Sequence, residues 1–308
     1  MRYIVIIFFI SSNCSAQNSD LLSAILHKEK VVEYFNDKKY DSVIFYHSQN
    51  KHLATHSFPD YRVETLVSLS YLELGNIDSG LFYMEKGFRN SISWDAASIR
   101  YAYKKYKLDN DPRYQSLLVH IDPLQQNRRN KINIKLREKY LKIYYTDQHF
   151  RKYIYDHNDT INKEIYLKLF NKTDSVNALR IVELIKLNNG FPTEDDIGEN
   201  ELYFVIYHVS KFLDMEYILI EIRKATLAGR LSNNYGPALI DYIRRGDGLV
   251  GLYGLKTFTN TEGKKQFSEI EDIKNLDKRR IEYLLPSLRR QAQIHNVILP
   301  QDYSPSEE

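Results

Sequence analysis

Three polar side chains in the C-terminal half of the chain have the chemistry of an acid–base site. They are His208, Asp147 and Asp241. A histidine exchanges a proton near neutral pH, and a carboxylate bonded to one ring nitrogen orients the other as a base. We therefore consider His208 a candidate base, with Asp147 or Asp241 as its orienting carboxylate. The alternatives are a hydrogen-bonded core histidine for His208 and, for Asp241, a solvated acid balanced by Arg244 and Arg245.

A second group of polar residues surrounds Asp147 in the sequence. Arg151 lies one helical turn beyond Asp147, and Tyr140 and Tyr144 continue the same helix face. The charges thus lie on a partly apolar stripe. They either face a cleft, with Gln148 and Arg151 as binding residues, or form an ion pair at a seam between packed elements. Such a pair at i,i+4 contributes ~0.3–0.5 kcal/mol.

Further binding candidates lie near the C-terminus. Arg279 and Arg280 are adjacent, and arginine binds carboxylate or phosphate through two parallel hydrogen bonds. Tyr253 precedes Gly254, where a glycine allows close approach of the backbone to a ligand or simply serves a turn. An ordinary helix start beside Asp277 equally explains the two arginines.

Motifs for metals, cofactors and phosphate are missing from the sequence. His52 and His56 have helical i,i+4 spacing and His47 is close by, but the tract has no acidic partner and is expected to form a loop. The chain has no nucleophile elbow, no His-Glu-x-x-His motif, no paired cysteines and no glycine-rich phosphate loop. We expect neither a metal nor a cofactor.

Composition indicates a folded, mainly helical chain. The 308 residues are 43% hydrophobic and 27% charged, which is near the average of globular proteins. Only 12 glycines and 8 prolines are present, which favours long helices over strand-rich folds with many turns. The net charge is +3, or +2 without Arg2, so it does not indicate a nucleic-acid partner. The basic run between residues 128 and 139 is expected to be a solvated helix face.

The N-terminus has the pattern of a secretory signal peptide. Arg2 precedes the apolar run Ile4 to Ile10, and a polar stretch of mostly small residues leads to Ala16. We expect cleavage after Ala16 and export to the periplasm or the exterior. Cys14, the only cysteine, would then leave with the signal, so the mature protein would have no disulfide. The alternative is a lipid anchor on Cys14; no other segment is long enough to span a membrane.

Two segments of the N-terminal half are alike. In each, a tyrosine precedes a polar turn and a second apolar helix start; these tyrosines are Tyr34 and Tyr71, 37 residues apart. Tyr71, Gly75, Ile77, Gly80 and Gly87 match the signature positions of a helical repeat, and Tyr34, Tyr40 and Val43 match them more weakly. The segment from about residue 20 to 120 therefore resembles tetratricopeptide repeats, which have a period of about 34 residues. A third, looser helix pair is expected at residues 94–106 and 111–115.

The rest of the chain is expected to form a second domain. Asp122-Pro123 is the predicted boundary, which divides the chain into a signal (1–16), a repeat-like domain (17–122), a helical domain (123–300) and a disordered tail (301–308). Predicted helices cover about 126–157, 174–188, 200–212, 215–228, 236–245 and 277–295. Gly190 is expected to end the second of them, and residues 248–267 read as a short β-hairpin.

A series of short motifs runs through this second domain. The motif positions are Asp147, Gln148 and Arg151; Gly190, Phe191 and Pro192; His208; Asp241; Tyr253 and Gly254; and Asp277, Arg279, Arg280, Leu285 and Pro286. In this order and spacing, residues 140–290 resemble a bacterial domain of unknown function, family 6624 in the numbered series. The chain departs from the family pattern at Tyr207, Tyr242, Gly251, Leu255 and Lys256, which replace Gln, Arg, Gln, Thr and Gln. The resemblance implies no known activity, and these losses put any family chemistry in doubt.

We therefore expect a mainly α-helical exported protein: helical hairpins, then a helical domain with one short β-hairpin. The leading functional hypothesis is an interaction module of the cell envelope, because helical hairpins in series build surfaces that bind peptides. The rival hypothesis is a hydrolase-like enzyme with His208 as its base. A third is a purely structural role for the polar residues.

Overall fold

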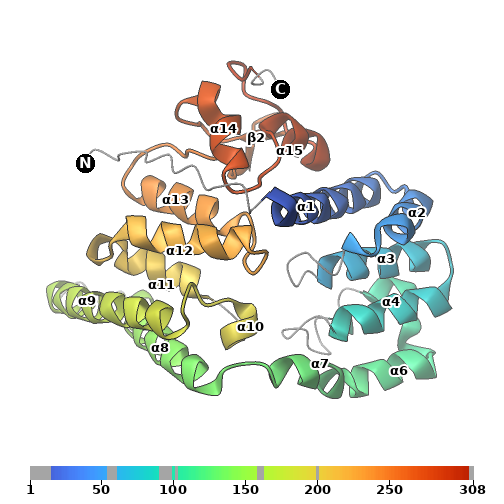
Figure 1. The fold of residues 1–308 in the computed structure, drawn as a ribbon, viewed down its shortest axis with the longest axis horizontal. Coiled ribbons are helices and arrows are strands. Elements are labelled where there is room, and N and C mark those ends of the chain that lie inside the picture. Colours follow the sequence, from blue (N-terminus) through green and yellow to red (C-terminus); the bar gives the residue numbers. More distant parts are fainter. Residues whose placement is uncertain are drawn as a thin grey trace.

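The computed structural model describes residues 15–53, 61–89, 99–100, 103–157, 163–198 and 201–304. The expected signal segment up to Cys14, and residues 305–308 of the expected tail, lie outside these ranges. The described chain is mainly α-helical with one short antiparallel hairpin, as the sequence predicts (Figure 1). No described helix is long and apolar enough to cross a membrane.

The N-terminal half begins with two helical hairpins. Their turns are equivalent at a spacing of 37 residues: Lys39 N donates to Tyr34 O (2.9 Å), and Asn76 N donates to Tyr71 O (2.9 Å). The residue before each donor has a positive φ, 59° at Lys38 and 78° at Gly75. The helices are α1 (Ser15–Asn36), α2 (Tyr40–Asn50), α3 (Tyr61–Glu73) and α4 (Ile77–Arg89).

A glycine sets the distance between α3 and α4. A Cβ atom added to Gly80 would lie 2.6 Å from Leu72 Cδ2, so a larger residue would push the helices apart. Ser68 Oγ donates to Gly80 O (2.7 Å) across the same contact.

Short helices connect this half to the second. The expected helix at 94–106 lies partly outside the described residues; its end forms η3 (Lys104–Tyr106), followed by η4 (Leu108–Asn110). Asp111 then caps α6 (Pro112–Val119), and its carboxylate accepts from Arg113 N (2.8 Å). Pro123 lies in the first turn of α7 (Ile121–Arg129), so the predicted domain boundary falls within a helix.

The long helix predicted from 126 to 157 is interrupted. The chain leaves α7 at Arg129 and enters α8 (Ile134–His157) only after a turn. Asn133 begins the new helix, because its side-chain oxygen accepts from Leu136 N (3.1 Å). An N-cap inside an otherwise helical pattern is the reason for this correction.

The helices of the second half, from α8 to α13, pack around one apolar core. α9 starts earlier than predicted, and Asn189 (φ 52°), not Gly190, has the left-handed conformation that ends it. Gly190 N then donates to Ile185 O (3.0 Å), which completes a Schellman motif. The elements are α9 (Lys163–Leu187), α10 (Glu194–Ile197), α11 (Leu202–Val209), η5 (Ser210–Phe212), α12 (Met215–Leu227) and α13 (Tyr235–Gly246).

The C-terminal unit contains the hairpin and two short helices. Strands β1 (Thr257–Thr259) and β2 (Lys265–Phe267) pair in the predicted region. The single helix predicted at 277–295 is two helices, because Leu284 (φ 55°) and Pro286 break it and Ser287 caps the second part. The helical elements are η6 (Ile273–Asn275), α14 (Leu276–Ile281) and α15 (Leu288–His295).

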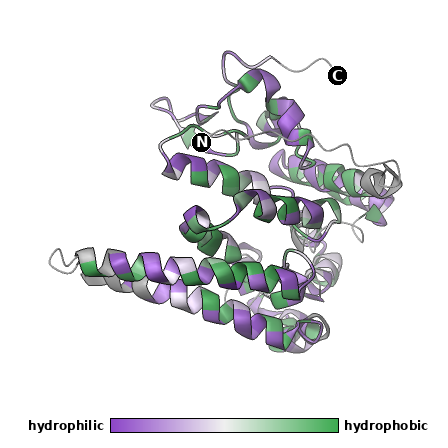
Figure 2. Ribbon diagram, turned by 60° about the vertical axis from the view of Figure 1, so that its left-hand side comes forward, coloured by the Kyte–Doolittle hydropathy of each residue, from purple (hydrophilic) through white to green (hydrophobic). Residues whose placement is uncertain are grey.

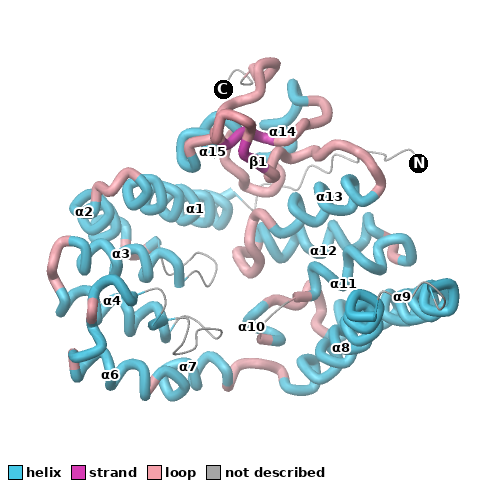
Figure 3. The backbone as a smooth tube through the Cα atoms, turned by 180° about the vertical axis from the view of Figure 1, so that it is seen from behind, coloured by secondary structure: helices cyan, strands magenta, loops and turns pink. Residues whose placement is uncertain are grey.

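The two ends of the described chain meet. α1 packs against α15, where Asn36 Nδ2 donates to Ile294 O (3.2 Å) and Arg290 pairs with Glu33. α1 and α15 lie side by side in the views from both sides of the molecule (Figures 1 and 3). The paired helices α8 and α9, by contrast, extend away from the rest of the molecule, at the lower left of Figure 2.

Candidate functional site

Asp147 and His208 form a hydrogen-bonded pair between two helices. Asp147 lies on α8 and His208 near the end of α11, and His208 Nδ1 is 2.9 Å from Asp147 Oδ2. The Asp147 side chain is 0% exposed, whereas that of His208 is 20% exposed. The carboxyl group is thus shielded from water while part of the imidazole stays accessible.

Three side chains hold the Asp147 carboxyl group in place. Besides His208, Gln148 Nε2 donates to Oδ2 (2.8 Å) and Arg151 Nε donates to Oδ1 (3.0 Å). An ionised carboxylate can only accept hydrogen bonds. The imidazole must therefore carry its proton on Nδ1, the nitrogen that faces Asp147. Nε2 of the neutral ring is then left with a lone pair, which is the arrangement of a histidine base oriented by a carboxylate.

Arg151 links this pair to a second acid, Asp174 on α9. Its Nη2 donates to Asp174 Oδ1 at 2.8 Å, and its guanidinium lies 5.1 Å from the ring centroid of Phe170. Burial raises the pKa of Asp174 despite the opposing effect of Arg151. Asp147, Arg151, Asp174 and His208 therefore form one partly buried charge network, which we call the dyad network.

Hydrogen bonds between α8 and the segment before α11 position the histidine. Glu201 N donates to Tyr140 OH (2.9 Å), and Arg137 Nη1 donates to Ile197 O (2.7 Å). A hydrogen bond to Glu201 and burial raise the pKa of Tyr144 to about 12. These contacts fix the start of α11 on α8, so that His208 arrives beside Asp147.

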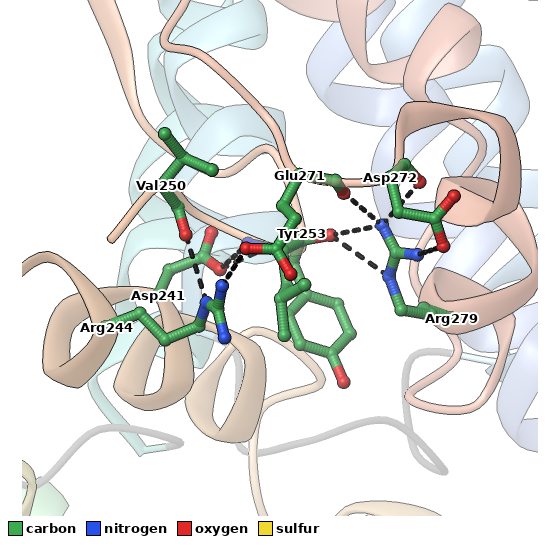
Figure 4. A network of polar contacts seen from close by, with 8 residues as sticks. Asp241, Arg244, Val250, Tyr253, Glu271, Asp272 and Arg279 are labelled. Carbon is green, nitrogen blue, oxygen red and sulfur yellow. Dashed lines mark hydrogen bonds and ion pairs between the residues drawn. The ribbon is translucent and has the colours of Figure 1, made fainter. Parts of the chain in front are cut away.

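Asp241 belongs to a different cluster, shown in Figure 4. Its Oδ1 accepts from the backbone amides of Leu252 (2.6 Å) and Tyr253 (3.0 Å), and its side chain is buried. Arg244, from the same helix, donates through Nε to Val250 O (3.0 Å). Asp241 thus holds the segment after α13 by its backbone and has no bond to His208.

The predicted binding residues Arg279 and Arg280 hold the same segment. Arg279 donates to Leu252 O (3.1 Å) and pairs with Asp272 (2.9 Å). Arg280 is fully buried and donates to the carbonyl oxygens of Tyr253 and Pro286. Burial lowers its pKa to about 10. Their donors are occupied by the chain itself, which favours a structural role for both arginines.

Tyr253 is also part of this packing. Its ring is buried and meets that of Tyr283 edge-on, with centroids 5.7 Å apart. Burial raises its pKa well above the usual tyrosine range. Gly254 has φ 62°, a backbone conformation that L side chains rarely adopt, so the turn favours glycine at this position. These contacts agree with the turn interpretation.

Two tyrosines lie between the two clusters. Tyr207, next to His208, meets Tyr242, next to Asp241, with ring centroids 4.4 Å apart. These two positions are among the departures from the family 6624 pattern that the sequence resembles.

Sequence reasoning brought together Asp147, Gln148, Arg151 and His208, and the structure places them in one network. The sequence prediction missed Asp174. The predicted helix began at this residue, whereas α9 begins at Lys163 and contains it. No local spacing in the sequence indicates the contact of Asp174 with Arg151, because Arg151 lies 23 residues away on another helix.

Within the described part of the histidine tract only His47 lies in a helix, and His52 lies in the turn that follows α2. His47 lies on α2, is buried, and stacks on His27 of α1 with centroids 5.4 Å apart; His56 lies outside the described residues. Among the residues that the structure describes, no group of three or more His, Cys, Asp or Glu side chains is placed to hold a metal ion.

Comparison of the chain with models of known families, with curated proteins and with solved structures finds no match. The resemblances to tetratricopeptide repeats and to family 6624 therefore stay predictions, and the functional argument rests on the site itself.

Proposed function

We propose that the protein is a hydrolase-like enzyme in which His208 acts as general base and Asp147 orients it. The observation that carries the proposal is the 2.9 Å bond from the partly exposed imidazole to a fully buried carboxyl group. The other candidate carboxylate, Asp241, does not supply this arrangement, because it bonds to backbone amides instead.

The chemistry follows from the open ring nitrogen. Nε2 removes a proton from a water molecule or a substrate hydroxyl as that oxygen attacks an electrophilic carbon or phosphorus atom. Asp147 stabilises the imidazolium that results, and Nε2 then returns the proton to the leaving group. No hydrogen bond joins His208 to a Ser or Thr hydroxyl in the described part of the chain, which favours water over a protein nucleophile.

The test is turnover by the purified mature chain on a panel of carboxylic ester, phosphate ester, glycoside and peptide substrates. We expect the wild type to hydrolyse one class and His208→Ala to lose at least about a hundredfold in rate, the usual contribution of a general base. His120→Ala is the matched control, since His120 is exposed at the end of α6. Equal rates for wild type and His208→Ala, or no turnover of any class, would contradict the proposal.

A second candidate is the exported interaction module, and one observation favours it. Phe45 on α2 and Phe82 on α4 occupy equivalent positions, 37 residues apart, and are 66% and 63% exposed. Repeated exposed aromatic residues on successive hairpins suit a partner with apolar side chains at matching intervals.

Capture of proteins from the native cell envelope tests this second function. The wild type should retain a partner that the double variant Phe45→Ala/Phe82→Ala releases, while Ile281→Ala, at an equally exposed residue elsewhere (67%), should retain it. A double variant that still captures every partner of the wild type would contradict this second function. Export itself is part of both proposals and is tested by N-terminal sequencing, with Gln17 expected as the first residue.

A further inference from the structure

Helix α9 carries a row of exposed apolar residues along the side that faces away from the molecule. Leu179 is 74% exposed, Ile165 59% and Leu187 56%, while Leu169 and Val176 are each 38% exposed. The opposite side of the same helix packs into the core through residues such as Ile181 and Ile185. Single exposed apolar residues are ordinary, but an aligned set marks a contact surface.

The spacing of this row is that of a coiled-coil seam. Its positions are separated by alternating steps of four and three residues: Ile165, Leu169, Lys172, Val176, Leu179, Glu183 and Lys186, with Leu187 beside the last. Residues at such intervals lie on one stripe of a helix and pack against a second helix. We call this row the outer stripe.

The two charged residues near its centre determine which partner fits. Lys172 and Glu183 lie at equal distances from the midpoint between residues 177 and 178, and so do Val176 and Leu179. If a second α9 runs antiparallel about this midpoint, Val176 faces the partner's Leu179, and Lys172 faces the partner's Glu183. A parallel pair would instead place like charges opposite each other at both positions.

We propose that the protein forms a symmetric dimer in which the outer stripes of two copies pack antiparallel. The projection of α8 and α9 from the body leaves this side of the helix open to a second molecule (Figures 1 and 2). In such a two-fold contact each opposite-charge pair occurs twice, which makes the surface self-complementary. A helix of this length offers one helix-pair contact, so the dimer is reversible and depends on concentration.

Charge exchange tests the register. The wild type should sediment as a dimer at high concentration, and Lys172→Glu alone or Glu183→Lys alone should raise the dissociation constant at least about tenfold, because each places like charges together twice. The double variant Lys172→Glu/Glu183→Lys should dimerise again. A mixture of the two single variants should form a heterodimer, since their charges are then complementary.

Lys139→Gln is the control, because Glu183 also pairs with Lys139 within the chain (2.8 Å, both side chains about half exposed). This variant should dimerise like the wild type, and circular dichroism should show equal helix content in all variants. A wild type that is monomeric at every concentration would overturn the proposal. Single variants that dimerise normally, or a mixture that fails to associate, would overturn it equally. None of these readouts depends on the activity of His208.

Discussion

The two buried carboxylates Asp147 and Asp241 have different roles, and the sequence alone does not distinguish them. Asp147 and Asp241 are both buried acids on long or well-formed helices of the second half. Asp147 bonds to side chains, one of which stays accessible, whereas Asp241 bonds to backbone amides of a following segment. The type of partner, and not the residue type, therefore assigns one to the candidate site and the other to the fold.

Asp241→Ala should lower the free energy of unfolding by about 3 kcal/mol, because two backbone amides, those of Leu252 and Tyr253, lose their buried acceptor. Asp241→Asn keeps the acceptor oxygen and should cost clearly less. Urea titration measures both, and Asp247→Ala, at the exposed end of the same helix, should change little. Equal stability of Asp241→Ala and wild type would show that the segment is held by the arginines alone.

At the scale of elements, the first two hairpins differ at several buried positions, and one of these differences places a histidine in the first hairpin. His47 in the first hairpin corresponds to Met84 in the second, 37 residues on. Burial, with His27 and two lysines nearby, lowers the pKa of His47 to about 4, and burial and His52 lower that of His27 to about 4. Ring nitrogens of both have no hydrogen-bond partner, so the pair is stable only while uncharged.

The folded protein therefore binds fewer protons at this pair than the unfolded chain, whose histidines have pKa values near 6.5. The contribution to stability is present above pH 6.5 and is lost as the pH falls toward 4 and below, by about 1.4 kcal/mol for each unit of pKa difference. His47→Met, which copies the second hairpin, should flatten this decline. Thermal melting between pH 7 and pH 4 measures it; an unchanged slope would mean that the pair does not titrate in this range.

At the scale of the whole molecule, contact between α1 and the C-terminal unit joins the ends of the described chain. Burial raises the pKa of Glu29 to about 7 although Arg290 and Arg280 oppose the shift. Glu33, one turn along, has a lowered pKa because Arg290 donates a hydrogen bond to it. The two acids thus give this contact opposite dependences on pH.

For Glu29 the folded state binds the extra proton, so its contribution is present below pH 4.5 and is lost as the pH rises through about 7. Glu29→Gln should therefore be more stable than wild type at pH 8 and close to it near pH 4.5. Glu33→Gln is the matched comparison and should be less stable than wild type at pH 8. The same sign for both variants in denaturant titrations would contradict this description of the contact.

Most of the helices, the β-hairpin and the grouping of Asp147, Gln148 and Arg151 follow from the sequence, because apolar spacing and i,i+4 pairs are local signals. The breaks at Asn133 and Leu284 do not, since an N-cap and a left-handed residue interrupt otherwise helical patterns. The choice of Asp147 over Asp241 also depends on packing between helices far apart in the chain. That choice follows only from the three-dimensional structure.

The proposed function requires that Asp147 fixes the proton of His208 on Nδ1 and leaves Nε2 as the base. Nitrogen-15 NMR of the imidazole, in wild type and in Asp147→Asn, tests it most directly. We expect the wild-type ring to carry its proton on Nδ1 and the tautomer balance to change in the variant. A wild-type ring protonated on Nε2, or one identical in both proteins, would contradict it.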